Sequence, residues 1–553
     1  MKKNPFSETS FFLLLLVVIL LNATTLFNEI LESDGTLYAC LAKHIATTNN
    51  WKDLWVQGAD FLDKPHLPFW IAAASFKIFG INAFAYKLPA FIFFIVSLAY
   101  CFKLADAIYN KTIAKIATLI YGTALHIIIS NFDGKVEIYL TAFILGATFH
   151  LYKAFQNKWF WHVVAAALFS ALAIMTKGIF ALITIMAGFV IYWIKTKQFN
   201  QFIQARWYLF IALVLIFIVP ELYSLYTQFD LHPEKIVFDK TNVSGLKFFF
   251  WDSQFGRFFN SGPIKGKGDV SFFLHTTLWA FLPWSVLLLL AMLNKFVKKI
   301  LPVNETKLII GGAAFITFIL FSLSKFQLPH YVVIIFPHFA MITASYIFDA
   351  ATEKVIKRIN YFQTALLVLV VLLMVWVTIL FSFNTYAWMA FAALIIFVSV
   401  LFYRPGLTAA AILNKNIGFA VFIAVYLNCI FYPALLLYQG GMMAGKWLNK
   451  NQYTGQAALY NCNSFGFTFY YKGNVAANKE QTQYINALQP KDSLLLLCPT
   501  NNFTDFNRDS FSIQILNTFP NFRVSQLTGK FINNKTRAAA IDSFTLAMLK
   551  RKI

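Results

Sequence analysis

Apolar residues recur along the chain in runs of about twenty, separated by short polar segments. A hydrocarbon core about 30 Å thick needs about twenty apolar helical residues to cross it. The pattern predicts a polytopic α-helical membrane protein with about thirteen transmembrane helices. The expected spans are Phe11–Leu31, Leu88–Leu104, Ile113–Ser130, Ile138–Tyr152, Trp159–Met175, Ile179–Ile194, Tyr208–Tyr226, Phe272–Leu293, Leu308–Leu323, Val332–Phe348, Tyr361–Phe381, Tyr386–Phe402 and Ile417–Tyr438.

Three polar regions lie outside these spans: residues 32–87, 228–270 and 439–553. In the first, Leu37–Thr47 and Pro68–Phe79 have the pattern of amphipathic helices that lie along a membrane surface. The tail contains short apolar runs between polar turns and is long enough to form its own core. The sequence thus predicts a transmembrane domain over residues 1–438 and a small soluble α/β domain over residues 439–553.

Composition and charge agree with a membrane protein. Of 553 residues, 59% are hydrophobic and 13% are charged, which excludes a disordered or fibrous chain and argues against a soluble enzyme. The formal charge is +22, but no basic stripe alternates with base-stacking aromatics, so nucleic acid is not expected as a partner. Lys and Arg instead follow the positive-inside rule, because Lys2 and Lys3 precede the first span and Lys111 and Lys115 fall in the next inward loop. All three polar regions then face outward.

The five cysteines have no CxxC pattern and no Cys/His metal spacing. Cys462 and Cys498 share the tail and can pair if that tail faces an oxidising compartment, but the sequence leaves this open. No metal or other cofactor is expected. A divalent metal is compatible with the chain but not supported by it.

Asp34 directly follows the first span and has two interpretations. Asp is a common N-cap, so it can cap a helix over Leu37–Thr47. A carboxylate at the outer membrane boundary is also placed to act as a general base for a lipid-bound reaction. Further on, Lys64 lies between Asp63 and Pro65, where it can be a point charge for a phosphate. The alternative is that this segment only turns the chain back to the interface, where Lys and Trp70 would anchor it.

Ionisable residues at membrane depth are costly, about 2.5–3.5 kcal/mol each at mid-bilayer, and are therefore informative. Glu137 and Lys177 are closely flanked by apolar sequence, whereas Asp133, Lys135 and Lys325 are expected to be loop residues that reach water. Two further polar residues, His330 and Tyr331, stand at an outer helix end. The cations Lys64, Lys177 and Arg257, beside the carboxylates Asp34 and Glu137, suggest an anionic ligand and acid/base chemistry.

These motifs occur in a recognisable order. The chain resembles the polyprenyl-phosphate-sugar-dependent glycosyltransferases, above all the aminoarabinose–lipid A transferases and more distantly the protein O-mannosyltransferases. The resemblance rests on Asp34-Gly35-x-x-Tyr38-Ala39, Leu62-Asp63-Lys64-Pro65-x-x-Pro68-x-Trp70, Ser75-Phe76-Lys77-Ile78-Phe79-Gly80, Glu137-x-x-x-Thr141-Ala142-Phe143, Met175-Thr176-Lys177-Gly178, Phe255-Gly256-Arg257-Phe258, Leu282-Pro283-Trp284 and Lys325-x-x-Leu328-Pro329-His330-Tyr331. The chain departs from the family at Gly35 and Leu37, where Glu and Arg are common, and at Glu137, where Asp is usual.

The resemblance implies a GT-C fold and an inverting transfer of a sugar from an undecaprenyl phosphate donor to an envelope acceptor, lipid A or another glycolipid. It implies that Asp34 and Glu137 are catalytic. Five residues would bind the donor phosphate: Lys64, Lys177, Arg257, His330 and Tyr331. Three would line the acceptor or sugar path: Tyr38, Asp63 and Trp70.

The resemblance also implies a bacterial inner-membrane protein whose site and tail face the periplasm. Two other functions stay open, a protein O-glycosyltransferase and a lipid-linked sugar flippase or transporter. The chain has neither the paired half-chain similarity nor the matched interrupted helices of repeat-built transporters, which favours the transferase.

Overall fold

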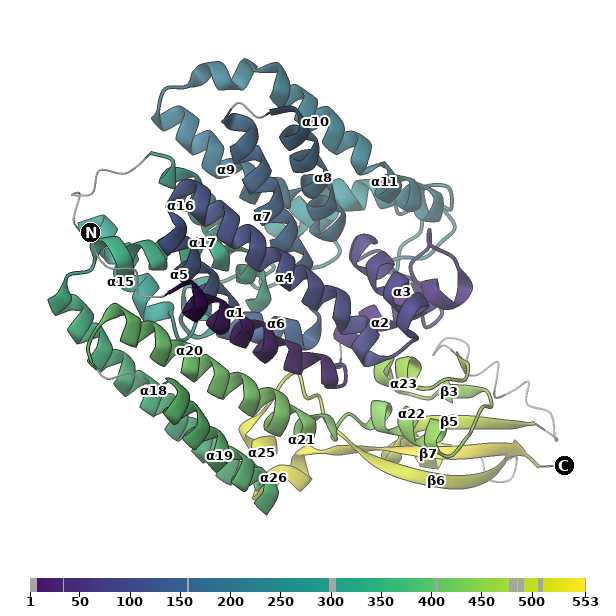
Figure 1. The fold of residues 1–553 in the computed structure, drawn as a ribbon. Helices are drawn as coiled ribbons and strands as arrows, with labels where there is room; N and C mark the ends of the chain where they lie inside the picture. Colours follow the sequence, from purple (N-terminus) through teal and green to yellow (C-terminus); the bar gives the residue numbers. More distant parts are fainter. Residues whose placement is uncertain are drawn as a thin grey trace.

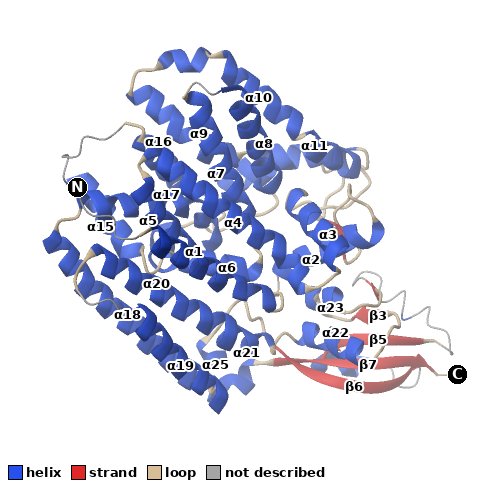
Figure 2. Ribbon diagram, in the orientation of Figure 1, coloured by secondary structure: helices blue, strands red, loops and turns tan. Residues whose placement is uncertain are grey.

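The computed structural model describes residues 7–32, 34–156, 159–297, 305–402, 406–476, 485, 492–505 and 511–552. A bundle of helices makes up most of the molecule, and a small sheet near the C-terminus lies at one end of it (Figures 1 and 2). Lys2 and Lys3, which carry the predicted orientation of the first span, lie outside the described residues.

The bundle forms from the apolar runs of the sequence. Its helices are α1 (Glu8–Ala23), α4 (Ala83–Ile108), α5 (Lys111–Gly122), α6 (Leu125–Asp133), α7 (Val136–Phe155), α8 (Trp159–Lys177), α9 (Phe180–Lys195), α10 (Ala205–Phe217), α11 (Val219–Leu225), α14 (Phe272–Ala280), α15 (Ser285–Val297), α16 (Lys307–Leu323), α17 (Phe336–Ser345), α18 (Glu353–Phe381), α19 (Thr385–Phe402), α20 (Ala409–Val425) and α21 (Tyr432–Leu436). Several of these helices begin with a polar N-cap residue. Asn82 and Asn110, for example, each accept a backbone N–H at the start of α4 and α5.

Within the described residues, 8 helices are long and apolar enough to cross a membrane, or up to 9 when the bent pair α5–α6 counts as one span. Shorter apolar helices, including α9, α16 and α19, occupy other predicted spans. The chain is thus a multi-pass membrane protein, and the number thirteen stays a prediction. The largest hydrophobic cluster extends through α4, α5, α7, α8, α9 and α17.

Two predicted spans are broken rather than continuous. Ile113–Ser130 divides into α5 and α6, which are bent by 55°. At the break the Leu125 N–H donates to the carbonyl of Leu282 at 2.8 Å instead of continuing the helix. Phe272–Leu293 divides into α14 and α15 on either side of the cis peptide bond Leu282–Pro283. The first polar region also ends earlier than predicted, since α4 begins at Ala83.

The two predicted outer loops are largely structured. The first contains α2 (Asp34–Thr48), the short strands β1 (Trp55–Val56) and β2 (Ala59–Asp60), and α3 (Leu67–Phe79). The helices α2 and α3 match the two amphipathic segments of the sequence, and they pack on each other and on Tyr86 and Val136 of the bundle. The second loop consists of short turns around η3 (Tyr226–Asp230), α12 (Gly245–Lys247), η4 (Phe248–Gly256) and α13 (Arg257–Phe259).

The C-terminal region begins with α22 (Gly440–Lys450) and contains a five-stranded sheet in the order β4-β3-β5-β7-β6. Strand β3 is parallel to β4 and β5, whereas β7 runs antiparallel to β5 and β6. The elements are β3 (Ala457–Leu459), α23 (Phe465–Tyr470), β4 (Val475–Ala476), β5 (Ser493–Pro499), β6 (Phe511–Asn521), α25 (Gly529–Ile532), α26 (Asn534–Arg537) and β7 (Asp542–Arg551). In Figure 1, α22 and α23 lie between the sheet and the helices α2 and α3.

Two of the contacts that attach the C-terminal region to the rest of the chain come from Arg537 and from α23. Arg537 donates hydrogen bonds to the carbonyl of Phe381 at 2.9 Å and to the hydroxyl of Tyr438 at 3.1 Å. Because Phe381 ends α18, the guanidinium satisfies a free carbonyl at that helix end. The second contact, between α23 and α2, is described in full below.

Candidate active site

A largely apolar cavity opens between the first loop and the bundle. Its polar wall contains Asp63, Lys64, Glu137, Lys177, Arg257 and Tyr331, which come from segments far apart in the sequence. The rest of the wall is mostly aliphatic and aromatic, from α7, α9, α11, η4 and α16. A cavity of this kind suits a ligand with one charged group and a long apolar part.

Asp63 lies between two of the cations. Its carboxylate accepts hydrogen bonds from Lys64 and from Arg257, and its carbonyl accepts a further one from Arg257 at 3.2 Å. Burial alone would raise the pKa of Asp63, but the two cations lower it to about 2. Burial lowers the pKa of Lys64 to about 8, opposed by Asp63 and reinforced by Arg257 and Lys177.

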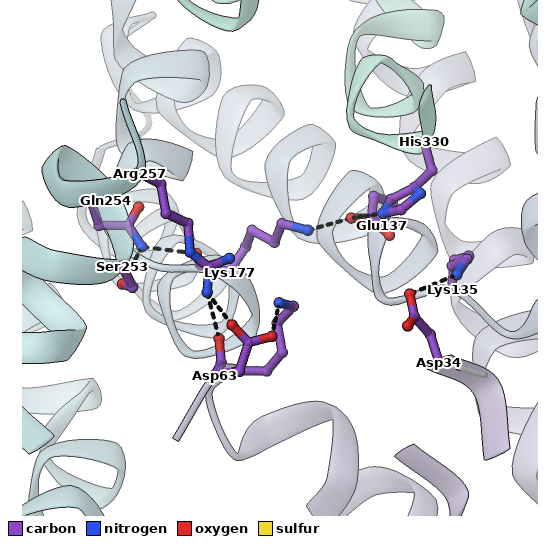
Figure 3. Close-up of polar contacts among 10 residues, drawn as sticks. Asp34, Asp63, Lys135, Glu137, Lys177, Ser253, Gln254, Arg257 and His330 are labelled. Atoms are coloured by element: carbon purple, nitrogen blue, oxygen red, sulfur yellow. Dashed lines mark hydrogen bonds and ion pairs between the residues drawn. The ribbon is translucent and has the colours of Figure 1, made fainter. Parts of the chain in front are cut away.

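Glu137 forms an ion pair with the third cation, Lys177. It is at the start of α7, is fully buried, and accepts a hydrogen bond from Lys177 at the end of α8 (Figure 3). His330 Nε2 lies 3.7 Å from the same carboxylate oxygen. The Lys177 ammonium is also 4.2 Å from the centre of the Tyr331 ring, within the range of a cation–π interaction.

Gly178 lets the chain turn directly after Lys177. It has a φ of +101°, and a Cβ there would lie 2.1 Å from the Gln254 side chain. Gln254 in turn donates to the Lys177 carbonyl at 3.3 Å. The glycine therefore allows η4 to pack against the end of α8, and this packing brings Arg257 toward the cavity.

A second buried pair fixes the loop that carries Lys64. His66 Nδ1 lies 2.9 Å from Glu221 of α11, and its Nε2 lies 3.0 Å from the Lys52 carbonyl oxygen. The Glu221 carboxylate and the Lys52 carbonyl are both hydrogen-bond acceptors within reach of the ring. The backbone N–H of His66 also donates to Glu221 at 3.0 Å. Glu221 thus anchors the loop two residues after Lys64.

Asp34 lies on the other side of Glu137, as the first residue of α2. Its carboxylate is 3.5 Å from Lys135 (Figure 3). Lys135 also forms an ion pair with Asp133 at 2.7 Å. Burial opposes the charge on Lys135, but Asp133 and Asp34 outweigh it and raise the pKa of this lysine. Gly35 permits the close approach of α2, because a Cβ there would lie 2.6 Å from Asp133. The departure from the family at Gly35 therefore has a steric reason.

The structure brings six of the predicted site residues to the cavity and leaves four outside its wall. Asp34 and His330 adjoin it through Lys135 and Glu137, as described above. Tyr38 is buried, with its ring 5.4 Å from that of Phe69. Trp70 donates from its indole nitrogen to the Trp51 carbonyl at 2.7 Å, a contact that fixes the loop.

One expectation about polar residues is wrong. Asp133 does not reach water as a loop residue: it is buried, and the α6–α7 turn that carries it and the partly exposed Lys135 is packed beneath α2. Sequence reasoning also missed His66 and Glu221. The position of Glu221 in a long apolar run was the signal that could have identified it, since a carboxylate there needs a partner.

The charges of the cavity nearly cancel. Three cations, Lys64, Lys177 and Arg257, face three carboxylates, Asp63, Glu137 and Glu221, and the last of these pairs with His66. Two buried atoms of these residues, Glu137 Oε2 and Arg257 Nε, have no hydrogen-bond partner among the described residues. Arg257 Nε can therefore donate to an anionic group in the cavity.

Within the part of the chain that the structure describes, no three His, Cys, Asp or Glu side chains form a cluster that could hold a metal ion. Cys462 and Cys498 are not joined by a disulfide in this structure, and the Cys462 thiol donates to the Leu497 carbonyl at 3.4 Å. The pairing that the sequence left open is therefore not formed.

The chain is similar to a known protein family, to individual relatives and to solved structures. The family described as dolichyl-phosphate-mannose-protein mannosyltransferase matches residues 63–223. An uncharacterised protein of Aquifex aeolicus is 24% identical over 63% of this chain, and an undecaprenyl phosphate-alpha-4-amino-4-deoxy-L-arabinose arabinosyl transferase of Proteus mirabilis is 24% identical over 65%. The matched regions span 65% and 64% of the length of these two relatives.

Two solved structures resemble the whole chain. ArnT from Cupriavidus metallidurans bound to undecaprenyl phosphate has a TM-score of 0.73 at 14% identity, with 98% of each chain covered. The apo form of the same protein has a TM-score of 0.68 at 15% identity, with 97% of each chain covered. The chain therefore has the GT-C membrane fold and resembles the aminoarabinose transferases in sequence and in fold, as the sequence motifs predicted.

Proposed function

We propose that this chain is an inverting glycosyltransferase. It transfers a sugar from a polyprenyl phosphate donor, such as an undecaprenyl phosphate sugar, to an acceptor in the cell envelope, lipid A or another glycolipid. The observation that carries the proposal is the convergence of Lys64, Lys177, Arg257 and Tyr331 on one apolar cavity beside two carboxylates. The named activity of the Proteus mirabilis relative, and the undecaprenyl phosphate bound to the Cupriavidus metallidurans protein, support the choice of donor.

The charge of the cavity suits this donor. A sugar-linked polyprenyl phosphate is a phosphodiester with one negative charge, and the three cations of the wall, Lys64, Lys177 and Arg257, can bind it. When the bond from the anomeric carbon to the phosphate oxygen breaks, its electron pair stays on the phosphate, which gains a second negative charge. Lys64, Lys177 and Arg257 would stabilise this developing charge, and such preorganised cations are often the largest contribution to catalysis. The apolar wall would hold the first part of the prenyl chain.

Asp34 would take the proton of the acceptor. The acceptor hydroxyl oxygen attacks the anomeric carbon from the side opposite the leaving phosphate, and its proton passes to the Asp34 carboxylate. Lys135 holds that carboxylate from the bundle side. Glu137 would keep Lys177 charged and in place. Tyr38, Asp63 and Trp70 would border the sugar or acceptor path.

The proposed setting is the inner membrane of a bacterium, with the site and residues 439–553 facing the periplasm. The charge bias of the inward loops and the multi-pass bundle support this orientation. The C-terminal region contains 13 Lys and Arg against 5 Asp and Glu from residue 440 onward, which suits a region close to an anionic membrane surface. A protein acceptor is the alternative, favoured by the description of the family that matches residues 63–223.

The test is donor binding and turnover by the purified full-length chain in detergent. The wild-type chain should bind undecaprenyl phosphate, and the Lys64→Met variant should bind it at least tenfold more weakly, since it loses a buried cation that faces the phosphate. Lys240→Met removes an exposed cation of the second outer loop and should change binding less than twofold.

Mass spectrometry of envelope glycolipids and proteins, with and without the gene, identifies the acceptor class. Loss of one sugar from a glycolipid supports the proposal, and loss of a sugar from proteins favours the alternative acceptor. An untransported lipid-linked sugar that accumulates, together with normal undecaprenyl phosphate binding by Lys64→Met, would contradict the transferase.

A further inference from the structure

The helix α2 carries the proposed base Asp34 at its start, and it is held from outside by the C-terminal region. Its neighbour there is α23, a short helix that lies beside it in Figure 1. Phe469 of α23 enters the same hydrophobic cluster as Tyr38 of α2 and Phe76 of α3. The ring of Phe469 is 5.9 Å from that of Phe76.

Charged residues on either side of this contact bind both ends of α23. Just before α2, the Glu32 carboxylate accepts hydrogen bonds from the Ser464 hydroxyl at 2.8 Å and the Gly466 N–H at 3.0 Å. From within α2, the Lys43 ammonium donates to the carbonyls of Thr468 at 2.8 Å, Phe469 at 3.1 Å and Tyr471 at 2.8 Å.

The arrangement matches the electrostatics of a helix. A negative charge lies at the amino end of α23, where free N–H groups point outward, and a positive charge lies at its carboxyl end, where free carbonyls point outward. Both charged groups are partly buried, and the carbonyls that Lys43 binds have no other described partner inside their short helix. Replacing either residue leaves polar groups of the other side without partners.

Other contacts continue the attachment on both sides of Asp34. The Ile30 N–H donates to the Tyr470 hydroxyl at 2.8 Å, and the Cys40 thiol donates to the Phe465 carbonyl at 3.3 Å. The Gln57 side chain donates to the Thr468 hydroxyl at 2.8 Å. On its bundle side, by contrast, the Asp34 carboxylate has the single ion pair with Lys135, at 3.5 Å, among its described charged contacts.

We infer that the C-terminal region positions the catalytic helix α2 through α23, with Glu32 and Lys43 as positioning residues for Asp34. This inference rests on the proposed function and extends it. The region outside the bundle would then contribute to the chemical step, not only to acceptor binding. A general base that moves by about 1 Å can lose about a hundredfold in rate, so a loose α2 would lower turnover without disturbing the donor cavity.

The experiment compares two lysine variants at the same interface. Lys43→Met removes the charge that binds the end of α23. Lys446→Met is the matched control, because Lys446 also joins the C-terminal region to the rest of the chain, through an ion pair with Glu29 and a cation–π contact with the Tyr470 ring, but its described partners do not include a residue of α2. We expect kcat to fall at least tenfold in Lys43→Met and less than twofold in Lys446→Met, while both bind undecaprenyl phosphate with wild-type affinity. Lys43→Arg, which keeps the charge and the donors, should restore most of the rate.

A second measurement does not depend on activity. Hydrogen exchange of the full-length chain should show faster exchange in residues 34–48 of Lys43→Met, with unchanged exchange in α7 and α8. Wild-type exchange in residues 34–48 together with wild-type turnover would overturn the positioning role. A wild-type chain that neither binds undecaprenyl phosphate nor transfers a sugar would instead contradict the proposed function, and the exchange result would still decide whether Lys43 holds α2.

Discussion

The two sides of the candidate site are built differently. On the donor side, each of the cations Lys64, Lys177 and Arg257 has a carboxylate partner and is partly buried, and the side chain of Glu137 is only 1% exposed. On the other side, the Asp34 carboxylate is 47% exposed, and its ion pair with Lys135 is long, at 3.5 Å. The donor side thus consists of paired charges set in a largely apolar cavity wall. The Asp34 side is an accessible carboxylate on a helix outside the bundle.

This difference suits two reaction partners that arrive in different ways. A lipid phosphate enters from the bilayer and needs charges that already point at it, since reorganising charges during the reaction costs free energy. An acceptor hydroxyl must reach a base from outside, so that base has to remain accessible. The donor side should therefore be rigid and sensitive to charge, and the Asp34 side should determine the rate of the chemical step.

The largest expected effect is on the Asp34 side. Asp34→Asn keeps the size of the side chain and one acceptor oxygen, but it removes the proton acceptor. We expect kcat to fall by about 10²–10⁴-fold, the usual contribution of general-base catalysis. Binding of undecaprenyl phosphate and the thermal midpoint should stay close to wild type, as measured on the purified chain.

Asp106→Asn removes an exposed carboxylate of α4 and serves as the control, with no expected change in rate. Near-normal turnover by Asp34→Asn would make Asp34 a structural residue at the start of α2. It would also remove the functional difference between the two sides.

The next effect concerns stability on the donor side. Lys177→Met leaves the buried Glu137 carboxylate without its ion pair, and breaking one partner of a buried pair typically costs about 3–5 kcal/mol. We expect a clearly lower thermal midpoint for Lys177→Met. The double variant Lys177→Met/Glu137→Gln should recover most of the stability, because no uncompensated charge remains.

The double variant should still bind undecaprenyl phosphate weakly, because its cation is missing. The single and the double variant would then differ in thermal stability but share weak donor binding. Recovery of binding together with stability would mean that Lys177 serves the fold and not the donor.

The sequence predicts the bundle well and the site only in part. Long apolar runs identify the helices because spanning a membrane requires them, and Glu137 and Lys177 stand out because charge is costly in such runs. His66 and Glu221 are 155 positions apart, and nothing in either segment indicates that they meet. The burial of Asp133 depends on how closely α2 approaches, which Gly35 allows but does not reveal. The hydrogen bonds of Glu32 and Lys43 to α23 connect residues far apart in the sequence, so only the three-dimensional structure shows them.

The smallest expected effect is a pH dependence that belongs to the donor side alone. Burial lowers the pKa of Lys64 to about 8 in the free protein, so this lysine loses its proton as the pH rises through that value. The phosphodiester donor keeps its single charge over this range, and the protonated lysine is the form that attracts it. Donor affinity should therefore be constant below about pH 7.5 and fall about fourfold between pH 7 and 8.5. In Lys64→Arg the side chain stays charged, and its donor affinity should not change over the same range. Equilibrium binding of the donor from pH 6 to 9 measures both chains. An equal decline in the two would assign the titration to another group and leave Lys64 without a special role among the three cations.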